Sequence, residues 1–248
     1  MKTVLITSGG TIEPIDGVRG ITNFATGKLG AVIADTLQDC RVFFIKNIKS
    51  AMPELSSPHL TVIETTDTLS VQEAIAHVMN NFHVDFFIHS MAISDYTVDK
   101  VVNVNDIAQL LDDKAQYSKE DILKIIHNPP VIENKSKVSS SISQPLIYLK
   151  QTPKIIDTIK KNWPHVKLIG FKLLNNVPHQ ELIDVALKSL IRTDADFIVA
   201  NDLTQITTDK HLAYIVSKDG VVAQSSTKKE LALTLQSFIH QSKSREIS

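Results

Sequence analysis

Glycine is concentrated near the amino terminus of this chain. Six of the eight glycines lie between residues 7 and 30, in the segment TSGGTIEPIDGVRGITNFATGKLG. Because glycine loses more conformational freedom on folding than any other residue, such a cluster indicates backbone that turns sharply or approaches another group closely. We expect that group to be a bound polyanion.

The elements predicted on either side of this loop favour phosphate binding. A buried strand is predicted over Thr3 to Ile6, and a helical pattern begins near Gly27. A loop in this position presents free amides and the positive end of a helix to an anion. The glycines lack the G-x-G-x-x-G spacing of a dinucleotide site. The next apolar run, Val42 to Ile45, also ends without the carboxylate that would bind a ribose. The pattern therefore predicts phosphate binding and disfavours an ordinary NAD site.

Apolar runs alternate with helical patterns along most of the chain. Further strands are predicted at 42–45, 60–64, 84–89, 146–149, 167–171 and 197–200. This alternation predicts an α/β fold with a doubly wound, mainly parallel, Rossmann-like sheet and a C-terminal hairpin. Ligands of such sheets bind beyond the carboxyl ends of the strands. We therefore expect Gly9 and Gly10 to share one edge with residues 90–96.

The alternation stops between residues 97 and 144. Only two short helical pieces are predicted there, and a Pro-Pro pair and the serine-rich run ENKSKVSSSISQP follow. One interpretation of this region is a solvated linker. A compact domain seldom carries so long an irregular segment without using it as a lid or an arm. We therefore expect a single nucleotide-binding α/β domain over residues 1–248, with an irregular arm or flap at about 97–145.

Composition excludes several classes of partner. The 26 Lys and Arg residues balance the 27 Asp and Glu residues, so no overall field attracts nucleic acid or a membrane surface. The single cysteine, Cys40, excludes an internal disulfide, and no Cys/His cluster has zinc-ligand spacing. No run resembles a signal peptide or a membrane span. We expect a cytoplasmic protein whose partners are small molecules or a second copy of itself.

Several polar residues are candidates for binding, each with a simpler alternative. Asn23 lies between two glycine clusters, where asparagine also serves as a turn or cap residue. Arg19 would bind phosphate through its fork of donors, unless it is simply solvated. Asp95 and Asn201 follow predicted strands. The Asp95 carboxylate would accept a hydrogen bond from a ribose hydroxyl or hold Mg²⁺, or would only cap the next turn.

Two lysines stand in the serine-rich run. Lys135 and Lys137 would close over an anion from a mobile arm, although surface lysines are common. The histidines are scattered, and no Ser/His/Asp or Cys/His set follows from spacing. Spacing alone therefore predicts an anion site and names no reaction.

The glycine loop and the later segments SMAISDY, KSKVSS, TPKII, GFKLL and ADFIVANDL closely resemble the phosphopantothenate-cysteine ligase family, also called phosphopantothenoylcysteine synthetase. The matches occur in order over nearly the whole chain, and they resemble the stand-alone bacterial form. The resemblance implies coenzyme A biosynthesis, in which 4'-phosphopantothenate is joined to L-cysteine through an acyl cytidylate. It also implies CTP as co-substrate, with ATP typical of eukaryotic members, together with Mg²⁺ and a homodimer. It identifies no metal ligands.

The resemblance also implies roles for individual residues. Asn23 matches the asparagine that serves the acyl-cytidylate intermediate, and the K-x-K pair matches the flexible segment that closes on the nucleotide. The implied catalytic residues are Asn23, Lys135 and Lys137, without a choice between the lysines. The implied nucleotide-binding residues are Gly9, Gly10, Thr11, Ser90, Met91, Asp95, Lys135, Lys137, Pro153, Lys154, Ile155, Ile156 and Phe171. The implied phosphate and substrate residues are Arg19, Asn23, Thr26, Gly27 and Asn201.

The chain departs from the family pattern at some positions. Ala25 stands where many members have serine, so one hydroxyl contact is missing or comes from Thr26. Two lysines of the fused bacterial enzymes fall near Ser189 and Thr193, where Lys188 or Arg192 would have to substitute. Two other functions stay open at this point. They are an NAD(P)-dependent oxidoreductase on a modified Rossmann sheet and a nucleotide-binding regulator without turnover.

Overall fold

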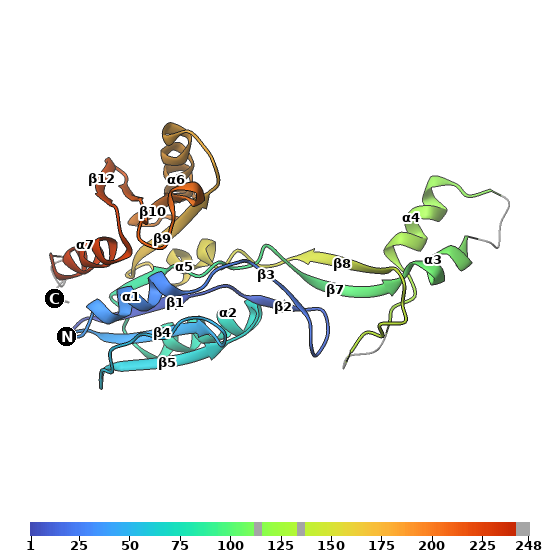
Figure 1. Cartoon of the computed structure of the whole chain (residues 1–248), viewed down its shortest axis with the longest axis horizontal. Helices are drawn as coiled ribbons and strands as arrows, with labels where there is room; N and C mark the ends of the chain where they lie inside the picture. Colours follow the sequence, from blue (N-terminus) through green and yellow to red (C-terminus); the bar gives the residue numbers. More distant parts are fainter. Residues whose placement is uncertain (112–115, 133–136, 242–248) are drawn as a thin grey trace. The chain divides into compact units, whose positions relative to one another are not determined.

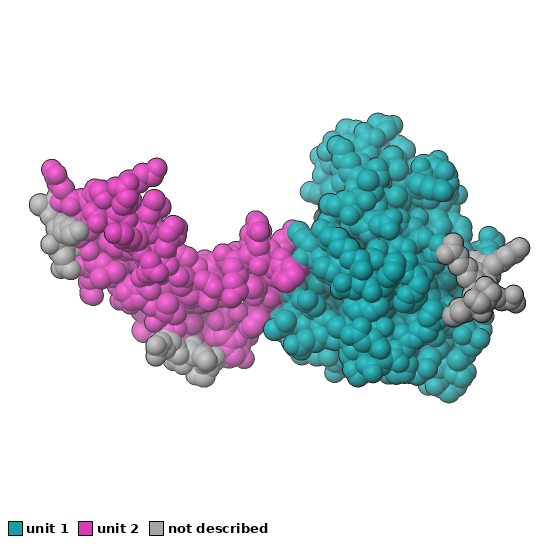
Figure 2. Space-filling model, turned by 180° about the vertical axis from the view of Figure 1, so that it is seen from behind, with its two compact units in different colours: residues 1–11, 24–93, 154–248 teal, residues 12–23, 94–153 magenta. Residues whose placement is uncertain are grey.

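The computed structural model describes residues 1–111, 116–132 and 137–241 (Figure 1). The chain divides into two compact units, which are coloured separately in Figure 2. Unit 1 comprises Met1–Thr11, Phe24–Ile93 and Lys154–Ser248, and unit 2 comprises Ile12–Asn23 and Ser94–Pro153. The chain thus leaves unit 1 twice. The expected arm at 97–145 falls within unit 2, but unit 2 also contains residues 12–23. That the whole chain forms one domain with an arm stays a prediction.

Unit 1 is built on an eight-stranded sheet with the order β12-β11-β10-β9-β6-β1-β4-β5. Its strands are β1 (Thr3–Ser8), β4 (Arg41–Asn47), β5 (Leu60–Thr65), β6 (Phe86–His89), β9 (Lys167–Leu174), β10 (Phe197–Asp202), β11 (Ala213–Ser217) and β12 (Gly220–Ser225). The pairing is parallel from β5 to β10, and β11 and β12 form the antiparallel hairpin. The predicted doubly wound sheet with a C-terminal hairpin is therefore confirmed.

Helices cover both faces of this sheet. Successive strand residues point to opposite faces, so Leu5 joins one apolar cluster and Val4 the other. The cluster containing Leu5 is covered by α2 (Thr68–Asn81), α5 (Ile156–Asn162) and α6 (His179–Thr193), and the cluster containing Val4 by α1 (Lys28–Thr36) and α7 (Lys228–Gln241). A short 3₁₀ helix, η1 (Leu203–Gln205), follows β10. None of the helices in the described ranges is long and apolar enough to cross a membrane.

Unit 2 contains more regular structure than the sequence predicts. It holds the antiparallel ribbon of β7 (Tyr96–Asn103) and β8 (Pro145–Gln151), the helices α3 (Val104–Leu110) and α4 (Lys119–His127), and the short hairpin of β2 (Ile12–Pro14) and β3 (Gly20–Thr22). The expectation of an irregular arm therefore needs correction in its secondary structure. β8 is exposed along most of its length, yet its apolar run at 146–149 is predicted as a strand. β7 is mostly half-buried or buried and has no continuous apolar run, so the sequence does not predict it.

Candidate functional site

Two segments predicted to bind nucleotide meet at the carboxyl edge of the central sheet. The amide of Ala92 donates to the carbonyl of Gly9 over 2.8 Å, and the amide of Thr11 donates to the carbonyl of Ala92 over 3.1 Å. Gly10 and Ala92 thereby form a parallel bridge. The expected proximity of the glycine loop and the segment after β6 is confirmed. Their contact with a nucleotide stays a prediction.

A buried histidine lies directly below this edge. His89 ends β6 between Thr7 of β1 and Gly170 of β9. Nδ1 of His89 is 2.7 Å from Oγ1 of Thr7. Burial lowers the pKa of His89 from 6.5 to about 4, so the ring is neutral at physiological pH. His89 could not be predicted as part of the site, because an apolar run ending in histidine gives no signal of a partner on another strand.

Contacts within the chain explain three glycines of the loop. A Cβ on Gly9 would lie 1.8 Å from Oγ of Ser50, and Gly9 has a φ of +91°. A Cβ on Gly27 would lie 2.9 Å from Cβ of Ser50, and one on Gly30 would lie 2.3 Å from Oγ of Ser8. These glycines let α1 and the residues after β4 approach β1 closely. Packing within the chain therefore accounts for Gly9, Gly27 and Gly30 without a bound polyanion.

The start of α1 is fixed by the same segments. The Ser8 hydroxyl donates to the carbonyl of Gly27 over 2.9 Å, and the Ala51 amide donates to the carbonyl of Thr26 over 3.0 Å. Gly27 has a left-handed backbone and gives no side-chain cap to α1. Thr26 and Gly27 thus lie at the carboxyl edge, beside Gly9, where a helix N-terminus would favour negative charge.

The apolar side chains among the predicted nucleotide-binding residues do not share one face of the sheet. Ile155 and Met91 belong to the apolar cluster that α5 covers, and Ile156 packs against it and over Gly170. Phe171 packs against the opposite cluster. A wall made of these residues would therefore use the backbone of residues 153–156 and not a common side-chain surface.

The polar end of β10 holds a neighbouring loop. Asn201 is 6 % exposed, and the carboxylate of Asp202 accepts from the amides of Asn176 and Val177 over 3.1 and 2.9 Å. Asp202 also accepts from the hydroxyl and amide of Thr204. The Thr204 hydroxyl, followed by the Val177 amide, holds the pKa of Asp202 well below its usual range. Asp202 is therefore committed to loop structure.

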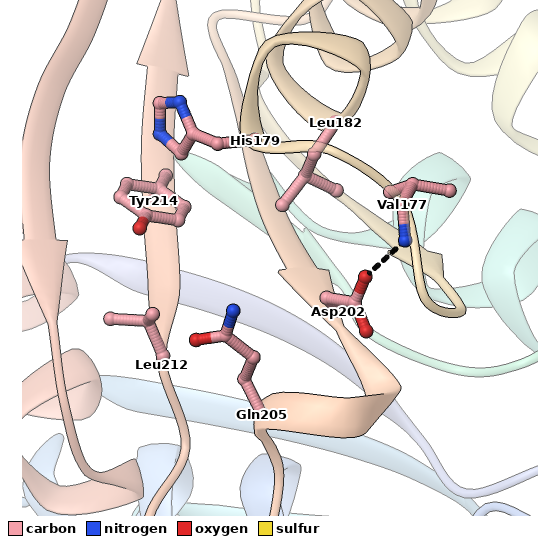
Figure 3. A pocket seen from close by; sticks show the side chains of 7 residues that line it. All are labelled: Val177, His179, Leu182, Asp202, Gln205, Leu212 and Tyr214. Atoms are coloured by element: carbon pink, nitrogen blue, oxygen red, sulfur yellow. Dashed lines mark hydrogen bonds between the residues drawn. The ribbon is translucent and has the colours of Figure 1, made fainter.

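Asp202 also lines a pocket in unit 1 (Figure 3). The pocket has a cavity volume of about 40 Å³, and the rings of His179 and Tyr214 meet edge to face with centroids 4.6 Å apart. Its lining contains no residue predicted for the site. The residues that line it are Val177, His179, Leu182, Asp202, Gln205, Leu212 and Tyr214.

The remaining predicted residues belong mostly to unit 2. Asn23 is exposed directly after β3, and the carbonyl of Asp95 accepts from the amide of Thr152 over 3.0 Å. This bond brings Asp95 close to Pro153, as a shared site requires. Lys137 is exposed. Lys135 lies outside the described residues.

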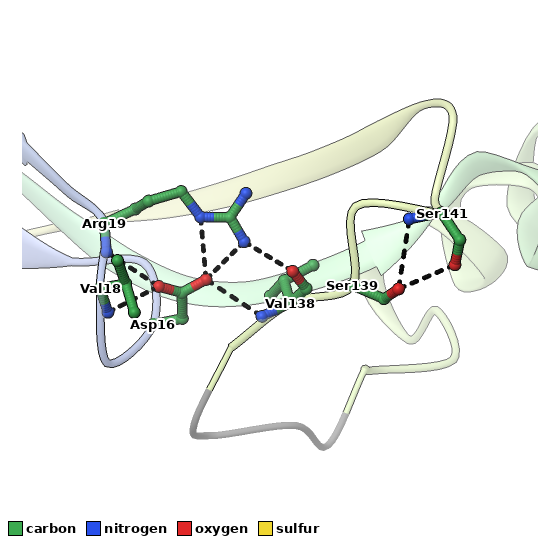
Figure 4. Close-up of polar contacts among 6 residues, drawn as sticks. All are labelled: Asp16, Val18, Arg19, Val138, Ser139 and Ser141. Atoms are coloured by element: carbon green, nitrogen blue, oxygen red, sulfur yellow. Dashed lines mark hydrogen bonds and ion pairs between the residues drawn. The ribbon is translucent and has the colours of Figure 1, made fainter.

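Arg19 is not directed into an open anion site. Its guanidinium binds the carboxylate of Asp16, and Nη2 donates to the carbonyl of Val138 over 2.8 Å (Figure 4). The predicted role of Arg19 at a phosphate receives no support from this geometry and stays a prediction. Arg192 binds Asp157, and Lys188 is exposed. Substitution for the family lysines by either residue also stays a prediction.

The sheet order and the loops at its carboxyl edge define a doubly wound α/β protein of the Rossmann-like class. A family model matches residues 1–131 and 127–242. The chain belongs to this family, the DNA/pantothenate metabolism flavoprotein C-terminal domain. The match confirms the family resemblance found in the sequence.

Individual relatives agree with this assignment. The chain is 31 % identical to the coenzyme A biosynthesis bifunctional protein CoaBC of Thermococcus kodakarensis, over 93 % of this chain and 49 % of that protein. It thus spans about half the length of the curated relatives it matches. The crystal structure of the DNA/pantothenate metabolism flavoprotein from Streptococcus pneumoniae is 37 % identical, with a TM-score of 0.81 over 97 % of this chain and 99 % of that one. A Cab2 mutant in complex with phosphopantothenate-cysteine, 19 % identical with a TM-score of 0.64, covers 96 % of this chain and 86 % of that one and shares the fold.

Proposed function

We propose that this chain is a phosphopantothenate-cysteine ligase that uses CTP in coenzyme A biosynthesis. The observation that carries the proposal is the direct bonding of Gly9 and Thr11 to Ala92 at the carboxyl edge of the sheet. Membership of the pantothenate family supports it, as does the name of the T. kodakarensis relative. The ligand of the Cab2 structure is the product that this reaction would give. Such a biosynthetic enzyme would work in the cytoplasm.

The proposed reaction has two displacements. The carboxylate of 4'-phosphopantothenate attacks the α-phosphorus of CTP, forming an acyl cytidylate and releasing pyrophosphate. The amine of L-cysteine then attacks the acyl carbon, CMP leaves, and the nitrogen loses a proton as the amide forms. The protein's part is positioning and charge stabilisation, because the nucleotide itself supplies the activation.

Each predicted residue has a role in this scheme. The amides of Gly9 and Gly10 would hold the phosphates, and the Asp95 carboxylate would accept from the ribose. Asn23 would serve the acyl cytidylate and its conversion to product. Lys137, together with Lys135, would stabilise the charge that develops on the phosphates.

We expect Mg²⁺ to accompany the nucleotide. Within the described ranges, no three His, Cys, Asp or Glu side chains gather closely enough to hold a metal ion. The phosphate oxygens of CTP would therefore supply most of the ligands, as is usual for this ion. The ion would offset the negative charge of the triphosphate.

We also expect a homodimer. Unit 2 exposes many large apolar side chains, and a second copy of the chain would remove some of them from water. The exposed residues include Tyr96, Ile122, Ile126, Val131, Leu146, Ile147 and Leu149. Light scattering on the purified protein should give twice the mass of the chain.

The activity is tested by following pyrophosphate. Purified protein should release it when CTP and 4'-phosphopantothenate are both present, and should form phosphopantothenoylcysteine when L-cysteine is added. Titrating CTP against ATP should give the lower KM for CTP. Failure to release pyrophosphate with either nucleotide would reject the ligase. Tight binding of NADH would favour an oxidoreductase.

A further inference from the structure

Asp16 is the centre of a hydrogen-bond network in unit 2 (Figure 4). Its side chain has no exposed surface, although it carries a charge. Oδ1 accepts from the amides of Val18 and Arg19 over 2.9 and 2.8 Å, and Oδ2 accepts from Nε of Arg19 over 3.0 Å. The Arg19 guanidinium, followed by the Val18 amide, holds the pKa of Asp16 well below its usual range. A carboxylate that accepts from several donors at once is held in one orientation.

The Asp16–Arg19 pair holds one peptide unit of a distant segment. The amide of Val138 donates to Oδ2 of Asp16 over 3.0 Å, and its carbonyl accepts from Nη2 of Arg19 over 2.8 Å. The side chain of Val138 is only 5 % exposed. Both backbone groups and the side chain of Val138 are therefore fixed, although it lies 122 positions from Asp16.

The residues on either side of Val138 differ in their contacts. The hydroxyls of Ser139 and Ser141 are 2.8 Å apart, and the Ser141 amide donates to the Ser139 hydroxyl over 3.2 Å. On the other side of the anchor, Lys137 directly precedes Val138 and is exposed. A restrained Val138 therefore limits the positions that the Lys137 backbone can take, because consecutive Cα atoms are about 3.8 Å apart.

We propose that the Asp16–Arg19 pair is a positioning device that holds Val138, and with it the backbone of Lys137, beside the hairpin that precedes Asn23. Asn23 follows Arg19 by four positions, directly after β3, so the pair links two predicted catalytic groups within unit 2. Asp16 and Arg19 are positioning residues, since they act through Val138. That Asp16 and Arg19 hold Val138 rests on the observed contacts alone. That this affects catalysis rests on the proposed function.

The chemistry of the pair suits this task. The planar guanidinium offers donors in a fixed fork, so it can bind a carboxylate and a carbonyl at the same time. A lysine in its place would keep the charge and lose this geometry. An arginine committed to Asp16 and Val138 has fewer donors for a phosphate, which separates this role from the phosphate contact predicted for Arg19.

The anchor is tested by hydrogen exchange at the Val138 amide. Asp16→Ala removes its acceptor, so exchange should be roughly 10- to 100-fold faster than in the wild type. Asp99→Asn is the matched control, because it removes an exposed ion pair with Lys150 elsewhere in unit 2. Amides of β7 and β8 should keep their protection in both variants, which shows that unit 2 is folded. Unchanged exchange at Val138 in Asp16→Ala would overturn the anchor.

The catalytic consequence is tested by kinetics with CTP. Asp16→Ala should raise the KM for CTP roughly tenfold, because Lys137 is no longer held, and Arg19→Lys should give an intermediate value. If Asp16→Ala only reduced the amount of folded protein, the apparent kcat would fall and the KM for CTP would not change. An unchanged KM for CTP would therefore overturn the positioning role. The two ideas can fail separately. If the wild type has no ligase activity but Asp16→Ala still speeds exchange at the Val138 amide, the proposed function is rejected and the anchor stands.

Discussion

Oγ1 of Thr7 lies 2.7 Å from Nδ1 of His89 and joins two neighbouring strands at the carboxyl edge of the sheet. The imidazole is 6 % exposed, and burial lowers its pKa from 6.5 to about 4. His211, 5 % exposed, also has a pKa lowered by burial to about 4. Both rings are therefore neutral in the folded protein at pH values where the unfolded chain already binds protons.

Stability should fall as the pH is lowered from 7 to 5. In this window the unfolded state binds more protons than the native state, so each buried histidine removes about 2 kcal/mol of the free energy of unfolding. In His89→Gln the side-chain amide can still bond to Thr7 and does not titrate. Only His211 would then contribute, so the loss of unfolding free energy between pH 7 and 5 should be about half as large. Urea unfolding at several pH values measures this. An equal pH dependence in wild type and variant would contradict the assignment to His89.

Asn23→Asp should separate binding from product formation. Asn23 is exposed after β3, so the change should not disturb packing, and the CTP Kd should stay within a factor of about three. Loss of the amide donor should lower formation of phosphopantothenoylcysteine by roughly 100-fold or more. Calorimetry measures the first quantity and product analysis the second. Asn81→Asp, at the exposed end of α2, is the matched control. Unchanged turnover in Asn23→Asp would mean that Asn23 only shapes the loop.

The central fold could be predicted because its parallel strands are short apolar runs that can be recognised from neighbouring residues alone. Residues 3–8, 41–47 and 86–89 are apolar runs buried on both faces, and the hairpin turn at Gly220 has the positive φ that glycine favours. In the ribbon, β8 contains a short apolar run at 146–149 that is predicted as a strand, whereas β7 gives no comparable run. The three-residue strands β2 and β3 are too short for any period to be seen.

The candidate site could be predicted only in part, because its contacts join distant segments. Alternation of strands and helices places Gly9 near Ala92, and the structure confirms this. The bond between Thr7 and His89 crosses 82 positions, and the Asp16 bond to Val138 crosses 122. No periodicity links residues so far apart. Arg19 is an example of a contact that the sequence does not predict. Its donors suit a phosphate, but in the structure they bind the carboxylate of Asp16 and the carbonyl of Val138.

Gly9→Ala should destabilise the protein more than Gly220→Ala. Both glycines have positive φ, at +91° and +101°, so both changes strain the backbone by about 1 kcal/mol. Nothing lies within 4 Å of a Cβ on Gly220, whereas one on Gly9 meets Oγ of Ser50. Gly9→Ala should therefore cost a further 1–3 kcal/mol, roughly, in urea unfolding. Ser50→Gly in the Gly9→Ala background should recover part of this. Equal costs for the two single variants would contradict the close packing at Gly9.

Cys40 should be unreactive while the protein is folded. It is the single cysteine of the chain and is 2 % exposed, and burial, with a smaller effect of Asp39, raises its pKa from 9.0 to about 11. At pH 8 only about 0.1 % of such a thiol is ionised, and the thiolate is the reactive form. Ellman's reagent should therefore modify native protein at least roughly 100-fold more slowly than protein in urea, where one thiol per chain should react. Native protein that yields one equivalent as fast as the unfolded chain would contradict the burial of Cys40.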